Sequence, residues 1–379
     1  MSNPSSTVSR RTLVTAIGAT AAALATAPAA HAAAPTAPAP TAPAAPEAPA
    51  AARTVTVPAT RARSVAGRAA AGVRTDFPIH YVGISWDGPR RGGAIRLHHE
   101  ETGPGAWQPI TAGCAGGPDV AGKAAAPASA VLVPAGGAVG YDLRLPDGAA
   151  NLRSTALDTT AGPARTAALS PTAPATLCGV EYLSRAAWGA DESKRFKNGV
   201  ENSPAKYYPL QTLTVHHTDT PNGDADPAAT VRAIYEYHAI TNDWGDIGYH
   251  FLIDEAGRIY EGRWSGDDGI PAHDANGNVV TAFHTAGFNS GNLGVALLGT
   301  LNSQDATPRA RRSLALVLAL AARTHGLDPQ ARVTFTNPVN GVTKPVDLIS
   351  GHRDWLATDC PGGTMYGTLP ALRAEVAAV

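Results

Sequence analysis

Cysteine is scarce in this chain, with three among 379 residues, so a disulfide-dense scaffold is excluded. The 30 Lys and Arg residues nearly balance 31 Asp and Glu residues. The resulting net charge of -1 provides no basic field for nucleic acid or for an anionic membrane surface. The sequence also lacks a His-Glu-x-x-His motif, which disfavours a thermolysin-like peptidase. The apolar content of 44% is that of an ordinary globular protein.

The N-terminal segment contains an apolar run that is too short and too rich in Ala and Thr to span a bilayer. The adjacent Arg10 and Arg11 precede this run, and Ala30, His31 and Ala32 form a small-x-small cleavage site. We therefore predict export by a signal peptide of the twin-arginine type.

The composition of the chain changes several times along its length. Ala, Pro and Thr dominate the residues after the signal and cannot bury enough apolar surface to order themselves. Short apolar or alternating segments separated by Gly, Pro and Asp then predict a small β-sandwich-like domain. Its role stays open. The predicted segments are a signal peptide over residues 1–32, a linker over 33–74, the all-β domain over 75–160, a second linker over 161–177 and an α/β domain over 178–379.

The C-terminal part alternates between strand and helix patterns. Asp226 followed by Pro227 predicts a helix start, and so does Thr307 followed by Pro308. One mixed central sheet with flanking helices is the fold class that accounts most simply for the pattern. The expected strands cover residues 210–217, 249–254, 258–263, 293–298 and 348–351, and the expected helices cover 227–240, 308–325 and 365–379.

Good zinc ligands occur at two places in this part of the chain. His352 and Cys360 are eight positions apart in one polar loop. His216 and His217 end an apolar strand, and alternation places His216 on the same face as Thr214. We predict His216 as the third ligand because a metal needs the polar face. Three protein ligands leave one position open, as in a hydrolytic zinc site.

Five ordered blocks of sequence carry a resemblance to a known family. The chain resembles the peptidoglycan recognition protein and type 2 N-acetylmuramoyl-L-alanine amidase family over roughly residues 178–379, about half its length. The blocks are residues 215–218, 244–253 with 260–263, 283–289, 293–296 and 351–362.

This resemblance implies a zinc-dependent hydrolase that cleaves the amide between N-acetylmuramic acid and L-alanine in peptidoglycan. It also implies a secreted, cell-wall-associated protein, which we expect to be a monomer. Trp244 is either a groove platform or a core residue. By position, the resemblance implies His216, His352 and Cys360 as zinc ligands, Tyr249 and Thr358 as catalytic residues, and His284, Asn289 and Arg263 as substrate-binding residues. The general base and the preferred stem peptide stay open.

The remaining cysteines and one insertion leave alternatives. With Cys360 on zinc, Cys114 and Cys178 are left for a disulfide, as expected in an exported protein. The rival pairing is Cys360 with Cys178 and no metal. That pairing would favour the alternative function, a peptidoglycan-binding recognition module without catalysis. The insertion over residues 265–280 is predicted to be a solvated loop, with calcium binding as the less favoured alternative.

Overall fold

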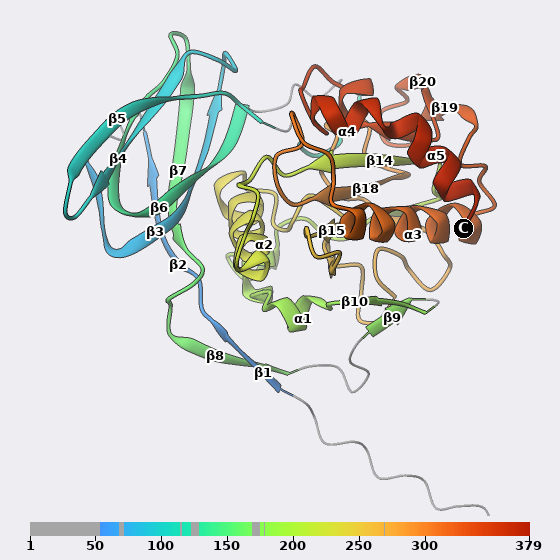
Figure 1. Cartoon of the computed structure of the whole chain (residues 1–379), viewed down its shortest axis with the longest axis horizontal. Coiled ribbons are helices and arrows are strands. Elements are labelled where there is room, and N and C mark those ends of the chain that lie inside the picture. The colour runs from blue at the N-terminus through green and yellow to red at the C-terminus, as the bar shows by residue number, and fades with distance from the viewer. Residues whose placement is uncertain are drawn as a thin grey trace, which may run out of the picture. The chain divides into compact units, whose positions relative to one another are not determined.

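The computed structural model describes residues 54–67, 72–113, 116–122, 129–168, 175–177, 179–268 and 270–379. Ala50–Val379 form one compact unit (Figure 1). The predicted signal peptide and the Ala/Pro-rich stretch up to residue 53 lie outside the described residues. Within the described ranges, no helix is long and apolar enough to cross a membrane.

The central sheet is mixed and has five strands in the order β16-β15-β18-β14-β21. β14 runs parallel to both β18 and β21, whereas β15 and β16 form an antiparallel pair. The predicted mixed sheet is therefore present. The strands are β14 (Thr212–His217), β15 (Phe251–Ile253), β16 (Ile259–Glu261), β18 (Asn292–Leu297) and β21 (Ile349–Gly351).

Helices cover both faces of this sheet. Leu213 and Val215 of β14 pack in the same cluster as Leu314 of α3 (Pro308–Thr324) and Leu372 of α5 (Leu369–Ala377). On the other face, Ala296 of β18 packs with side chains of α2 (Pro227–Glu236). Because successive strand residues alternate between faces, His216 points to the α2 side.

The helix starts follow their predicted caps. The Asp226 side chain accepts a hydrogen bond from the Ala229 N–H, and the Thr307 hydroxyl accepts one from the Ala310 N–H. α2 continues into a π-helical turn, η2 (Tyr237–Thr241), so the predicted helix changes its hydrogen-bond pattern near its end. The other helical elements are α1 (Arg185–Trp188), η1 (Glu192–Arg195), η3 (His352–Asp354) and α4 (Gly363–Gly367).

The N-terminal part of the unit is an antiparallel six-stranded sheet in the order β2-β7-β3-β6-β4-β5. One face buries a cluster that includes Ile79, Ile84, Trp86 and Tyr141. That these residues form a domain of their own stays a prediction, since Ala50–Val379 cluster as one unit. The strands are β2 (Arg61–Ala66), β3 (Val73–Asp87), β4 (Gly93–His99), β5 (Gly103–Ile110), β6 (Ser129–Arg144) and β7 (Ala150–Asp158).

Two segments expected to be unstructured linker form strands instead. β1 (Thr54–Pro58) pairs with β8 (Ala164–Ala168), and β2 pairs with β7. The expectation was wrong for these residues because their backbone groups are satisfied by partners roughly a hundred residues away, which local composition does not reveal. The remaining strands are short: β9 (Ala175–Leu177), β10 (Val180–Tyr182), β11 (Phe196–Lys197), β12 (Val200–Glu201), β13 (Tyr207–Tyr208), β17 (Val279–Val280), β19 (Arg332–Thr336) and β20 (Thr343–Asp347).

The insertion over residues 265–280 is more closely packed than a solvated loop. Ala272 and Val279 are fully buried in the main core, and the His273 ring stacks on His325 at 5.1 Å between centroids. Asp274 uses its Oδ1 to accept hydrogen bonds from the backbone N–H groups of Asn276 and Asn278. Residues 267, 268, 270 and 275–277 are exposed, so the prediction of a solvated loop holds for these residues and is wrong for the buried ones, such as Ala272 and Val279.

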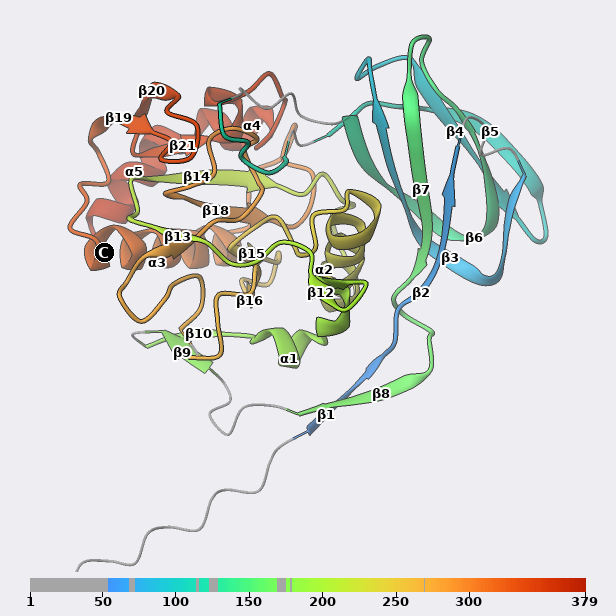
Figure 2. The same ribbon diagram turned by 180° about the vertical axis from the view of Figure 1, so that it is seen from behind.

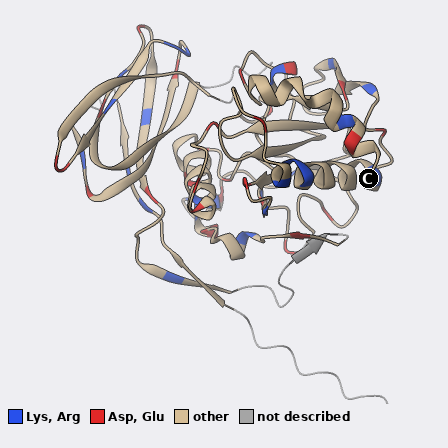
Figure 3. Cartoon of the chain, in the orientation of Figure 1, with Lys and Arg blue, Asp and Glu red and all other residues tan. Residues whose placement is uncertain are grey.

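Charged residues of both signs are interspersed over the strands and helices (Figure 3). This distribution agrees with the balance of basic and acidic residues in the sequence.

Candidate metal centre

The fold brings His216 and His352 to one edge of the central sheet. His216 lies near the end of β14, and His352 follows directly after β21. These parallel neighbours pair Val215 with Gly351, so the next residue of each strand lies at the same carboxyl edge. Parallel strands present their carboxyl ends together, which explains why residues distant in sequence meet here.

Cys360 reaches the same place through the loop that follows η3. The Arg353 N–H donates to the Cys360 carbonyl at 3.0 Å, which closes the loop on itself. Asp354 accepts the Gly351 N–H at 2.8 Å and the Tyr366 hydroxyl at 2.6 Å. These bonds set the turn that carries both His352 and Cys360.

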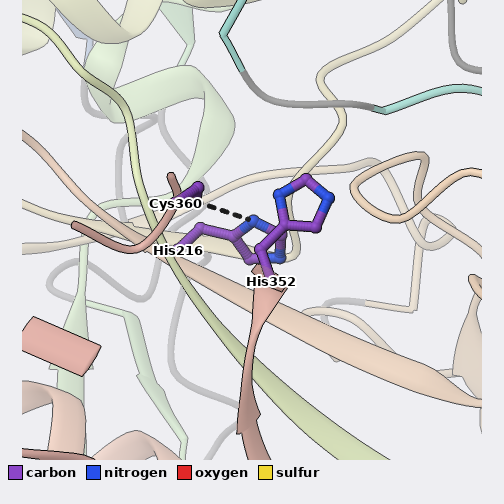
Figure 4. Close-up of side chains that lie close together, drawn as sticks. All are labelled: His216, His352 and Cys360. Atoms are coloured by element: carbon purple, nitrogen blue, oxygen red, sulfur yellow. Dashed lines mark hydrogen bonds between the residues drawn. The ribbon is translucent and has the colours of Figure 1, made fainter. Parts of the chain in front are cut away.

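His216, His352 and Cys360 form a buried group whose candidate ligand atoms all lie within 4.8 Å of one another. Figure 4 shows the three side chains converging, with Cys360 Sγ 3.6 Å from His216 Nδ1. Zinc bonds of about 2.3 Å to sulfur and about 2.0–2.1 Å to nitrogen at a tetrahedral angle place two such atoms about 3.5–3.6 Å apart. The observed separation matches that spacing.

The chemistry of His352 fits a metal as well. Both of its ring nitrogens are buried, and neither finds a hydrogen-bond partner among the described residues. Burying a polar atom without a partner costs about 1–3 kcal/mol. Coordination would remove this cost, and two imidazoles with one thiolate are a zinc-type donor set. The residues present therefore fit zinc.

His217 lies on the opposite face from this group. Its Nδ1 accepts the Leu301 N–H at 3.1 Å, and its backbone N–H lies 3.4 Å from Cys360 Sγ. The structure thus places His216, and not His217, among the three candidate ligands.

His284 is hydrogen-bonded to His216. His216 Nε2 lies 2.9 Å from His284 Nδ1, and His284 Nε2 lies 3.0 Å from the Asn292 carbonyl. Burial holds the pKa of His284 well below its usual value, so its ring is neutral. A neutral ring that donates from Nε2 to the carbonyl accepts at Nδ1, so His216 donates from Nε2 and directs Nδ1 towards Cys360.

Tyr249 stands beside His216 just before β15. Its side chain is buried, and its ring centroid lies 5.3 Å from that of His216 and 5.5 Å from that of His238. Tyr249, His238, Trp244 and His284 line a cavity of about 50 Å³.

His238 lines the same cavity, although no sequence pattern predicted it. Its Nδ1 accepts the Gly248 N–H at 3.0 Å, and its ring lies 4.7 Å from Trp244. It belongs to the π-helical turn η2, and such turns are frequent at functional sites. The sequence pattern there predicts only a continuing helix, so no local signal marks His238.

Thr358 lies next to Cys360. Its hydroxyl accepts the Cys360 N–H at 3.3 Å, and both residues line an open pocket of about 690 Å³ together with Arg90 and Arg91. Thr358 is half-buried, so its side chain reaches this pocket.

The other predicted substrate residues are more enclosed. Trp244 is buried in the wall of the small cavity. Arg263 is buried with its guanidinium 4.3 Å from the Phe283 ring centre, and burial lowers its pKa. Asn289 is fully buried and hydrogen-bonded within the chain. Their roles in binding substrate stay predictions.

The predicted disulfide cannot be placed on this framework. Cys114 and Cys178 both lie outside the described residues. The pairing of these two cysteines stays a prediction.

Residues 206–363 match the family model Amidase_2, described as N-acetylmuramoyl-L-alanine amidase. A human N-acetylmuramoyl-L-alanine amidase is 32% identical over 168 residues, which cover 42% of this chain and 24% of the human protein. Peptidoglycan-recognition protein SC2 of Drosophila melanogaster is 29% identical over 195 residues, 50% of this chain and 85% of the fly protein. The chain spans about a quarter of the length of the mammalian amidases that it matches.

Solved structures similar to this chain include Drosophila PGRP-LB, at 21% identity over 50% of this chain and 93% of that chain, with a TM-score of 0.37. Another is the N-acetylmuramoyl-L-alanine amidase LysC from Clostridium intestinale, at 23% identity over 46% of this chain and 91% of that chain, with a TM-score of 0.33. Residues 206–363 therefore match the Amidase_2 family, and the curated relatives that match this half of the chain are N-acetylmuramoyl-L-alanine amidases and peptidoglycan recognition proteins.

Proposed function

We propose that this protein is a zinc-dependent amidase that cleaves the bond between N-acetylmuramic acid and L-alanine in peptidoglycan. The observation that carries the proposal is the buried convergence of His216, His352 and Cys360, in which both ring nitrogens of His352 lie without a hydrogen-bond partner among the described residues. The family membership of residues 206–363 supports the substrate class.

In this proposal, His216 Nδ1, a ring nitrogen of His352 and the Cys360 thiolate would hold the zinc. The thiolate makes the site one formal charge less positive than a site of three histidines. His284 holds the His216 ring in the required tautomer through the 2.9 Å bond. When bound, zinc supplies a Lewis acid that polarises the amide carbonyl.

The residues around the site supply orientation and charge stabilisation. The Tyr249 hydroxyl donates a hydrogen bond to the amide oxygen as negative charge develops on it, because its ring stands beside His216. Thr358 borders the open pocket next to Cys360 and bonds the carbonyl from that side. All three candidate ligand residues are buried, which would keep water away from their side chains.

The deciding experiment incubates zinc-loaded protein with purified peptidoglycan. We expect release of new alanine amino termini without new reducing sugar ends. Cys360→Ala should abolish release together with zinc binding. Binding to peptidoglycan without any release from the wild-type protein would contradict the amidase and assign the chain to the alternative, a recognition module without catalysis.

We also propose that the protein is exported and acts at the cell wall as a monomer. Arg10 and Arg11 ahead of the apolar run support a twin-arginine signal, and Ala32 ends the predicted cleavage site. N-terminal sequencing of the secreted protein should begin at Ala33. An intact N-terminus on membrane-retained protein would overturn the cleavage.

The Cys114–Cys178 disulfide is a further part of this proposal. Oxidation of a thiol pair is expected in an exported protein. Mass spectrometry of the unreduced protein should find one peptide pair linked through these cysteines. Two alkylatable thiols at these positions would reject the linkage.

A further inference from the structure

We propose that residues 116–122 form an autoinhibitory strap that occupies the substrate groove beside Tyr249 and must withdraw before a muropeptide binds. The inference rests on the proposed function, because it concerns the groove of that same site. The strap belongs to the connection between β5 and β6 of the six-stranded sheet. Figure 2 shows this teal segment lying away from its own sheet, against the part of the chain that carries the central sheet.

The glycines of the strap are inserted between residues of the groove wall. A Cβ atom on Gly116 would lie 2.4 Å from the Phe283 carbonyl oxygen and 2.5 Å from the Trp244 ring. The Gly117 N–H donates to the same Phe283 carbonyl at 3.0 Å. This approach is so close that only a residue without a side chain fits at position 116.

Asp119 anchors the strap through four hydrogen bonds. Its carboxylate accepts the Asn289 N–H at 3.2 Å and the Asn289 Nδ2 at 2.9 Å. It also accepts the Ser290 N–H at 2.9 Å and the Ser290 hydroxyl at 2.8 Å. Asn289 Nδ2 donates as well to the Gly117 carbonyl at 2.8 Å. Thus Asn289, a residue predicted to bind substrate, has its donors occupied from within the chain.

The strap leaves too little room for a ligand in the cavity beside Tyr249. The cavity beside Tyr249 and His238 is lined by Gly116 and Gly113 and measures about 50 Å³. Sites for drug-sized ligands are typically about 300–1,000 Å³. A sugar joined to a peptide cannot enter this cavity from the open pocket at Thr358 unless the strap moves.

The strap is also held in a way that permits release. Between β5, which ends at Ile110, and β6, which begins at Ser129, none of the described residues belongs to a helix or strand. None of the hydrophobic clusters formed by described residues includes a residue of the strap. Pro118 and Val120 are exposed. Hydrogen bonds and the close approach of Gly116 to the Trp244 ring hold the strap, and a segment outside the hydrophobic clusters opens more easily than one packed in them.

Two variants dislodge the strap by different means. Asp119→Asn weakens the charge-assisted bonds, and Gly116→Ala introduces a methyl group against Phe283 and Trp244. Asp147→Asn is the matched control, because Asp147 is an exposed residue in a turn of the same six-stranded sheet. All chains are full-length, zinc-loaded and carry Tyr249→Phe, so that bound ligand is not consumed.

The first measurement is hydrogen exchange of the backbone amides over residues 283–292. The second is the affinity for soluble muropeptides with diaminopimelate or lysine stems. Loss of charge-assisted bonds shifts the closed-to-open ratio by about tenfold to a hundredfold, and apparent affinity follows the open fraction. Both strap variants should therefore exchange faster and bind at least one muropeptide about tenfold or more tightly, whereas Asp147→Asn changes neither.

The outcomes distinguish a failure of the strap proposal from a failure of the amidase proposal. Unchanged or weaker muropeptide binding in both strap variants would overturn the strap and make residues 116–122 a fixed wall of the site. Unchanged exchange over residues 283–292 would overturn it too. If both strap variants bind muropeptide more tightly but release no alanine amino termini when they carry the native Tyr249, the amidase proposal fails and the strap stands.

Discussion

Replacing His284 by Phe should weaken zinc binding although His284 is not itself a candidate ligand. The substitution keeps an aromatic ring of similar size but removes the acceptor of the His216 Nε2–H bond, which measures 2.9 Å. It also removes the donor to the Asn292 carbonyl at 3.0 Å. The orientation of His216 towards Cys360 then loses its support.

The magnitude follows from the burial of the pair. His216 and His284 are 0% and 2% exposed, so water does not replace the lost bond readily. Loss of a partner of a metal-binding histidine typically costs 10–100-fold in metal affinity. This range corresponds to ~1.4–2.7 kcal/mol and agrees with the ~1–3 kcal/mol cost of leaving a buried polar group unsatisfied.

Competition with a chromophoric zinc chelator measures the affinity, and thermal unfolding with and without zinc reports whether the variant is folded. His250→Phe is the control, because His250 is another fully buried histidine, with its ring 5.5 Å from that of His284. Its hydrogen bonds go to the Val280 carbonyl and the Gly294 N–H, and not to a candidate ligand. The control should lose stability but keep its zinc affinity.

Equal zinc affinity of folded His284→Phe and wild-type protein would refute the reasoning. An equal loss in both variants would attribute the effect to general destabilisation and also refute it.

Three further predictions concern neighbouring residues. Tyr249→Phe should lower kcat about 10²-fold or more with zinc affinity unchanged, whereas Tyr260→Phe, whose hydroxyl bonds to Asp254, should keep kcat; full activity of Tyr249→Phe with zinc bound would contradict the role of its hydroxyl. Gly294→Ala should weaken zinc binding in a chelator titration, because its Cβ would lie 2.6 Å from the His284 ring; unchanged affinity would show that the ring yields without cost. Burial lowers the pKa of His250 to about 3, below the ~6.5 of the unfolded chain, so the unfolded state binds the extra proton as pH falls. The free energy of unfolding of metal-free protein should therefore drop by up to about 1.4 kcal/mol per pH unit between about pH 6.5 and 3 through this group, and urea titrations of His250→Phe should show a shallower decline; an identical slope would contradict it.

Much of the central fold follows from local signals. Asp226 and Thr307 mark the starts of α2 and α3 as predicted, because a side-chain cap acts within one helical turn. The strand ending at His217 alternates as expected, which places His216 on the face away from Leu213 and Val215. These features depend on residues close together in the chain.

The features that were wrongly predicted or not predicted have a common cause, which is their dependence on contacts distant in the sequence. β1, β2 and β8 lie in segments expected to be linkers, because their stability comes from pairing with distant strands. His238 was not predicted as a site residue. It lines the cavity from a π-helical turn, and the spacing of apolar residues does not indicate such a turn. Part of the insertion is buried because Ala272 and Val279 pack in the main hydrophobic core.

By itself, the sequence determined the type of chemistry available: two histidines and a cysteine of the zinc-binding kind, with a tyrosine in an ordered family motif. Donor chemistry belongs to the side chains and survives any arrangement of the chain. Only the tertiary structure decided which atoms meet. It brought His284 within hydrogen-bond distance of His216, and Asp119 within hydrogen-bond distance of Asn289. Hydrogen bonds and steric contacts act over a few ångströms, so they depend on distances that are reached only when the chain folds.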